Sequence, residues 1–342
     1  MSETSEQKSA PAVQWEGLVG GLVIGAILLV GGHAVWKAMS ETGQVTSFQS
    51  ANADRYGESS LQHVADHLLT HTREGQFTTG MGELWGVAVA PDGSILACGD
   101  AGLRRYAASG EVLHELISDT MVRAIDVGAD GTIYVCVGNT LQLLNADGTP
   151  RSVWSGFGDG ARLTAVAASS EAVFVADGSA KRILRLSASG EILGSFGSIK
   201  DDVKNGLNIP GPYLDIDRGA DGNIYVSNPG RHHVNAYSPD GELQFVIGRP
   251  SFKHEGFCGC CNPVAIAVAP DGSIVTTEKG IARTKMLGSD GELIGIVAPP
   301  SDFGGVKHAF AVDVAIGADG RIYLAETGTQ SVFVYAPKGD RG

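Results

Sequence analysis

A short phrase recurs along this chain and constrains its fold more than any other feature. An apolar run is followed by Asp-Gly and then by a second run rich in β-branched residues. Five copies are VAVAPDGSILACGD from Val87, IDVGADGTIYVCVG from Ile125, DIDRGADGNIYVSNPG from Asp215, IAVAPDGSIVTTEKG from Ile266 and DVAIGADGRIYLAETG from Asp313. A degenerate copy, AVAASSEAVFVADG, begins at Ala165. Repeats of about 40 to 50 residues are typical of the blades of a β-propeller.

Each copy contains four strand-like runs separated by Gly, Asp and Asn, which are the residues of hairpin turns. The last copy ends before a fourth run appears, so its outermost strand is missing. The natural donor is the segment 74–79, because an N-terminal strand would close the ring and remove an open edge. The sequence therefore predicts an all-β, six-bladed β-propeller over residues 74–342.

These copies resemble the NHL family of six-bladed propellers over roughly residues 80 to 337. The stretches NPGRHHVNAY, EGFCGCCNPVAIAV and TTEKGIARTKM are also similar to a bacterial subgroup of NHL proteins that carries an EGFCGCCNP signature. The resemblance implies a six-bladed propeller fold and indicates a site at the EGFCGCCNP stretch. That subgroup has no settled activity, so the resemblance implies no reaction.

A single transmembrane helix is predicted over residues 15–37, after a polar tail of residues 1–14. Residues 17–36 carry no charge and are long enough to span a bilayer, with Trp15 and Trp36 at the ends. A cleaved signal peptide is the alternative, although the apolar run is long for one. We expect the acidic propeller to be exported, which places it on the periplasmic side of a bacterial inner membrane.

Three glycines of the apolar run, Gly17, Gly21 and Gly25, recur at steps of four. Small residues at this spacing let two membrane helices approach closely. The partner would be a second copy of the chain or another membrane protein. Glycine is also simply frequent in membrane helices, which is the alternative explanation.

Residues 38–73 are expected to be a linker that contains a short amphipathic helix. Leu61, Val64 and Leu68 recur at helical spacing, and His63, His67 and His71 would form a stripe on the same helix. Two imidazoles one turn apart can chelate a metal ion. A solvated polar stripe beside an apolar face is the simpler explanation.

The composition narrows the classes of function. The chain has 342 residues and a formal net charge of −13. An acidic chain without a basic stripe argues against nucleic-acid binding. The glycines follow turn positions rather than a phosphate-binding loop, and no Gly-x-Ser-x-Gly nucleophile motif is present.

The cysteines divide into two groups. Cys98 and Cys136 end the second strands of consecutive copies, and we expect them to be buried and not disulfide-bonded. Cys258, Cys260 and Cys261 lie together in the loop before the first strand of the fifth copy. Thiolates beside imidazoles suit copper, zinc or an iron–sulfur cluster. The predicted ligands of such a metal are Cys258, Cys260, Cys261, His254 and His308, and a disulfide that staples the loop is the alternative.

In NHL-like blades the first strand is innermost, and two kinds of loop open on one face, opposite the Asp-Gly turns. These are the loops that precede the first strand and those that join the second and third strands. The cysteine loop is of the first kind. The other polar residues expected on this binding face are Arg123, Arg162, Tyr213, Arg231, His232, His233, Glu278, Lys279, Arg283 and Glu326.

Four aspartates on the predicted inner strands, Asp126, Asp215, Asp217 and Asp313, have the same strand parity. They could surround the axis and hold a cation or ordered water. The simpler interpretation is that they accept hydrogen bonds from backbone amides of the next blade.

The leading hypothesis for function is an accessory or interaction subunit of a membrane complex, with the cysteine face contacting a partner or holding a redox-active metal. A metal-dependent hydrolase or lyase at the mouth of the channel is the first alternative, since six-bladed relatives include lactonases and amidating lyases. A small-molecule sensor on the same face is the second alternative.

Overall fold

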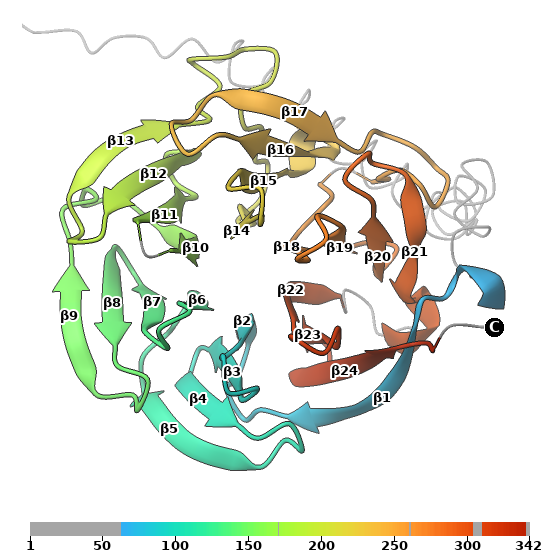
Figure 1. Cartoon of the computed structure of the whole chain (residues 1–342), viewed down its shortest axis with the longest axis horizontal. Helices are drawn as coiled ribbons and strands as arrows, with labels where there is room; N and C mark the ends of the chain where they lie inside the picture. The colour runs from blue at the N-terminus through green and yellow to red at the C-terminus, as the bar shows by residue number, and fades with distance from the viewer. Residues whose placement is uncertain (1–62, 170, 260, 304–309, 340–342) are drawn as a thin grey trace, which may run out of the picture. The chain divides into compact units, whose positions relative to one another are not determined.

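A computed structural model of the chain describes residues 63–169, 171–259, 261–303 and 310–339. Six four-stranded antiparallel sheets follow one another around a central axis, as Figure 1 shows. The all-β, six-bladed propeller predicted from the repeats is confirmed.

The first strand of each repeat is innermost and the fourth lies at the rim (Figure 1). In chain order the sheets are β2 (Leu84–Val89), β3 (Ile95–Gly99), β4 (Gly102–Tyr106), β5 (Val112–Ser118); β6 (Ala124–Val127), β7 (Ile133–Val137), β8 (Thr140–Leu144), β9 (Pro150–Trp154); β10 (Leu163–Ala168), β11 (Ala172–Asp177), β12 (Arg182–Ser187), β13 (Ile192–Phe196); β14 (Ile216–Arg218), β15 (Ile224–Asn228), β16 (His233–Tyr237), β17 (Leu243–Ile247); β18 (Ile266–Val268), β19 (Ile274–Glu278), β20 (Arg283–Leu287), β21 (Leu293–Ala298); and β22 (Ala311–Ile316), β23 (Ile322–Glu326), β24 (Ser331–Pro337) with β1 (His71–Thr78).

The Asp-Gly dipeptides form the turns between first and second strands. Gly93 has a φ of 79°, a conformation that glycine adopts without strain. The preceding aspartate closes the turn, since Asp92 Oδ1 accepts hydrogen bonds from both the amide and the hydroxyl of Ser94. Asp130 makes the same two interactions with Thr132. This chemistry explains why Asp-Gly is followed by a small polar residue in these copies.

The hydrophobic core lies between neighbouring sheets. Every residue of the second strands β3, β11, β15, β19 and β23 is buried, because adjacent blades cover both of their faces. The fourth strands behave differently: four of the five residues of β13 are exposed. Burial therefore falls from the inner part of each blade to its rim.

The ring closes through its N-terminal strand, as predicted. β1 pairs antiparallel with β24, from His71 opposite Pro337 to Thr78 opposite Ser331 (Figure 1). The strand is a little longer than the expected segment 74–79. It occupies the position that a fourth strand would have in the last blade.

The histidine stripe is not formed. The described residues just before β1 contain only a three-residue 3₁₀ helix, η1 (Asp66–Leu68), and His71 belongs to β1. Pairing of Leu69 with Ile296 and of β1 with β24 fixes an extended backbone here, so strand pairing overrides the helical spacing. His63, His67 and His71 therefore do not share one helical face.

The predicted membrane helix, with Gly17, Gly21 and Gly25, lies outside the described residues. Among the residues that the structure does describe, no helix has the length and apolar character needed to cross a bilayer.

Candidate functional site

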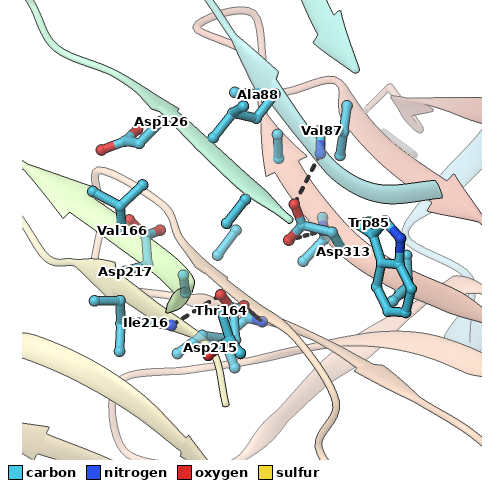
Figure 2. A pocket seen from close by; sticks show the side chains of 18 of the residues that line it. Trp85, Val87, Ala88, Asp126, Thr164, Val166, Asp215, Ile216, Asp217 and Asp313 are labelled. Atoms are coloured by element: carbon cyan, nitrogen blue, oxygen red, sulfur yellow. Dashed lines mark hydrogen bonds between the residues drawn. The ribbon is translucent and has the colours of Figure 1, made fainter. Parts of the chain in front are cut away.

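The six innermost strands surround a central cavity of about 270 Å³. Its wall is built from first-strand residues and from the segments that precede them, including Trp85, Arg123, Thr164 and Tyr213. Figure 2 shows Trp85 and the four inner-strand aspartates around this space.

The four aspartates connect neighbouring blades. Asp126 Oδ2 accepts a hydrogen bond from the Ala168 amide at 2.7 Å, and Asp313 Oδ2 accepts one from the Val87 amide at 2.8 Å. Asp215 and Asp217 accept in the same way from the amides of Ile266 and Val268. The second oxygen of each carboxylate accepts from the amide of the following residue. The interpretation that these aspartates bind amides of the next blade is confirmed.

Blades that supply the carboxylates alternate around the ring with blades that supply the amides. The carboxylates come from β6, β14 and β22, and their inter-blade amides come from β10, β18 and β2. At the matching positions the sheets that donate these amides have only glycine or alanine: Gly86, Ala88, Ala165, Ala167, Ala265 and Ala267. A Cβ on Gly86 would lie 2.9 Å from Cys98 Sγ and 3.3 Å from Asp313 Oδ2, so the space for a side chain here is limited.

Burial raises the pKa of all four carboxyl groups. For Asp217 and Asp313 the pKa rises to about 7, although hydrogen bonds from backbone amides act in the opposite direction. The pKa of Asp215 is raised well above its ordinary value by the loss of solvation, with repulsion from Asp313 and Asp217 adding to it.

The mouth of the cavity carries two cation–aromatic pairs. The Arg123 guanidinium carbon lies 4.7 Å from the centre of the Trp85 ring, and Lys279 Nζ lies 5.0 Å from the centre of the Tyr213 ring. We call these four residues the mouth residues. Among the described residues, neither Arg123 nor Lys279 has a side-chain hydrogen bond or an ion pair, so their charge is available to a ligand.

The cysteine loop packs beside this mouth. The buried Asn262 side chain donates to the carbonyls of Cys258, at 2.7 Å, and Lys279, at 3.0 Å, and accepts from the Lys279 amide at 2.9 Å. His232 Nε2 donates to the Gly259 carbonyl at 2.6 Å. These contacts connect the loop to the β15–β16 and β19–β20 connections on the same face. Cys258 and Cys261 are both buried.

A buried ion cluster supports the same loop. Glu278, Arg283 and Lys285 have no exposed surface. Glu278 forms ion pairs with Arg283 at 2.6 Å and with Lys285 at 3.2 Å, and both cations donate to the Gly256 carbonyl. Burial lowers the pKa of Lys285 to about 8, because the loss of solvation outweighs the attraction of Glu278.

The candidate metal ligands do not form a metal site in the described part of the chain. Cys260 and His308 lie outside it, and the remaining residues include no group of three or more His, Cys, Asp or Glu side chains placed to hold a metal ion. His254 Nδ1 lies 3.0 Å from Arg283 Nη1, and because a guanidinium can only donate, this nitrogen accepts. With two of its five predicted ligands outside the described residues, the metal site stays a prediction.

Most of the other predicted face residues have structural contacts. Arg231 donates to the carbonyls of Gly206 and Val203 and so holds the long β13–β14 connection. Glu326 is buried and accepts hydrogen bonds from Thr329 and Gly328. Burial lowers the pKa of His233 to about 4, with Arg231 and His232 adding repulsion. Arg162 Nε is buried without a hydrogen-bond partner in the described structure.

Two residues that help to build this face and its supporting ion cluster were not identified from the sequence. Trp85 occupies the same repeat position as Arg123, so aligning the copies and comparing this position could have found it. Lys285 lies on the third strand, where repeat position gives no sign of a functional role. Cys98 and Cys136 are buried and free, as expected.

Comparison with solved structures shows the same fold. A Bacteroides thetaiotaomicron protein of unknown function matches with a TM-score of 0.56 and 16% identity, over 78% of this chain and 72% of that chain. Virginiamycin B lyase from Staphylococcus aureus, in a catalytically inactive variant with quinupristin, matches with a TM-score of 0.52 and 16% identity, over 76% and 82%. A streptogramin B lyase matches with a TM-score of 0.53 and 13% identity, over 80% and 100%.

At these identities the likeness establishes the six-bladed propeller fold alone. Comparison of the sequence with models of known protein families gives no match, and no curated protein matches it.

Proposed function

We propose that this chain is a membrane-anchored, NHL-type propeller that acts as an accessory subunit of a membrane complex and binds its partner through the face around the mouth residues. The observation that carries the proposal is the pair of cations, Arg123 and Lys279, which lie beside aromatic rings and have no side-chain hydrogen bond or ion pair among the described residues. A charge without a counter-ion on a rigid surface is available to an approaching group, and it also steers association.

The rigidity of this face supports a binding role. Asn262 and His232 fix the cysteine loop by hydrogen bonds, and Arg231 fixes the β13–β14 connection. A surface ordered before binding loses less conformational entropy when a partner docks. The cysteine loop belongs to this surface in the proposal.

The apolar segment 17–36 supports anchoring in a bacterial inner membrane, with the propeller on the periplasmic side. Its glycines, Gly17, Gly21 and Gly25, offer a second contact with a membrane partner or a second copy of the chain. The surface charge and the anchor then act together, since a tethered domain meets its partner at high effective concentration.

Co-purification from membranes tests the proposal. The full chain carrying Arg123→Glu and Lys279→Glu should lose its membrane partner in a mild detergent, while the melting temperature stays within a few degrees of the parent. Arg151→Glu, at the rim on β9, is the matched control and should retain the partner. Equal recovery of the same partner by all three proteins would overturn the proposal.

A lyase acting at the channel mouth is the alternative that the fold likeness favours, because two structural neighbours are lyases. Incubation of the full chain with quinupristin, followed by chromatography of the antibiotic, tests it. Conversion that is lost in the Arg123→Glu and Lys279→Glu protein would favour the enzyme over the accessory subunit.

A further inference from the structure

The channel mouth carries two cations although the whole chain is acidic. The chain has a formal net charge of −13, yet the mouth presents Arg123 and Lys279 without a carboxylate partner among the described residues. Two exposed acids lie near these residues: Asp100 accepts a hydrogen bond from Trp85, and Glu83 contributes to the raised pKa of Tyr213. Neither acid forms an ion pair with Arg123 or Lys279 among the described residues, so both cations remain available to an anion.

The aromatic walls of the mouth are held in place. Trp85 Nε1 donates to Asp100 Oδ1 at 2.8 Å, which fixes the indole. Tyr213 packs edge-on against Phe310, with ring centres 5.7 Å apart and an angle of 90° between the rings. Both aromatic rings therefore offer flat apolar surface in a fixed position. Each ring already lies beside a cation, so an anion is favoured over a further cation as the ligand.

The four inner-strand aspartates, which we call the floor of the cavity, do not compete with the cations for such an anion. All eight oxygens of Asp126, Asp215, Asp217 and Asp313 accept hydrogen bonds from backbone amides. Each carboxyl oxygen of the floor therefore already has a donor, and the amide dipoles offset part of its negative charge. The charged end of an anion would therefore stay at the mouth, beside the cations.

The size of the cavity limits the ligand. At about 270 Å³ it lies just below the range of roughly 300 to 1,000 Å³ that is usual for drug-sized ligands. We propose that the channel mouth binds a small organic carboxylate, with its charge held by Arg123 and Lys279 and its flat apolar body against Trp85 and Tyr213. The inference depends on the proposed function only in taking this face as the recognition surface.

Three isosteric probes test the sign of the charge. Benzoate, benzamide and benzylammonium have similar shapes and carry charges of −1, 0 and +1. Calorimetry on the full chain in detergent should give benzoate a dissociation constant on the order of 1 mM, as expected for so few atoms. Benzamide and benzylammonium should bind about tenfold more weakly, because they lack charge-assisted hydrogen bonds to the cations.

Two variants locate the binding. Arg123→Met with Lys279→Met should weaken benzoate binding at least about tenfold and leave benzamide nearly unchanged. Arg151→Met is the matched control and should bind benzoate like the parent. An unchanged melting temperature shows that the variants are folded.

Several results would overturn the inference: tighter binding of benzylammonium than of benzoate, benzoate binding that survives the double substitution, or no binding of any probe at 50-fold the expected dissociation constant. The probes are free molecules and need no protein partner. If the probes fail to bind as expected but the Arg123→Glu and Lys279→Glu protein still loses its partner in the co-purification experiment, only the carboxylate inference is rejected. The proposed function then stands.

Discussion

Residue by residue, buried charge concentrates in two places, the channel floor and the base of the cysteine loop. At the loop, Arg283 and Lys285 face a single carboxylate, Glu278, and carbonyls of residues 254 and 256 satisfy their remaining donors. Lys285 Nζ also lies 3.9 Å from the centre of the Phe257 ring. The cluster orders the loop, because each group removed would leave a partner buried without compensation.

Glu278→Gln should lower the free energy of unfolding by about 3 to 5 kcal/mol, since it leaves two buried cations without a counter-ion. Glu115→Gln is the matched control, because its ion pair with Arg104 is partly exposed and should be worth less than about 1 kcal/mol. Chemical denaturation of both variants measures the difference. Equal effects would show that the buried cluster does not stabilise the blade.

The channel aspartates predict a dependence of stability on pH. The pKa of Asp217 is about 7 in the folded protein and near 3.9 in an unfolded chain. The folded state therefore holds this proton more tightly, and the corresponding stability is fully present below about pH 4 and is lost as the pH rises through about 7.

Asp217→Asn should remove this contribution, so its unfolding free energy should fall less than that of the parent between about pH 4 and pH 7. The difference should be up to about 3 kcal/mol, and denaturation at a series of pH values measures it. Parallel profiles for the two proteins would contradict the raised pKa.

At the scale of elements, the last blade depends on a strand from the other end of the described chain. β1 pairs with β24 through seven residues, and Phe77 packs on Tyr106 of the neighbouring blade, with ring centres 5.1 Å apart. The incomplete last repeat made this closure predictable, because the other repeats supply four strands each and the last repeat supplies only three.

A chain that begins at Gly80 should be less stable than one that begins at His63 by about 3 kcal/mol or more, and it should aggregate through the exposed β24 edge. Thermal unfolding and light scattering check both effects. A shorter chain that melts like the longer one and stays monomeric would show that β1 is not needed for closure.

The repeat predicted the strands and the faces well because both follow from periodicity. It predicted exposure poorly at Glu278, Arg283 and Glu326, which were expected on loops but lie at the ends of strands and are buried. Long connections fold over these positions: residues 254 and 256 reach Arg283, and no periodic pattern encodes such a contact. The histidine stripe failed for a related reason, since pairing with a distant strand decided the conformation of residues 69–78.

For the whole molecule, the fold gives a rigid ring with two distinct ends. The Asp-Gly turns lie at one end, and the mouth residues and the cysteine loop lie at the other. The proposed function requires that binding occur only at the second end. Pro212, exposed at the mouth, and Ala129, exposed in an Asp-Gly turn, are matched positions for distinguishing the two ends.

Site-specific photocrosslinking in intact membranes compares these two ends directly. The full chain would carry a benzophenone amino acid in place of Pro212 or of Ala129, and the crosslinked products would be identified by mass spectrometry. The Pro212 position should crosslink to one membrane protein, and the yield should fall when Arg123 and Lys279 are changed to glutamate. Crosslinking of that protein from Ala129 and not from Pro212 would contradict binding through the channel mouth.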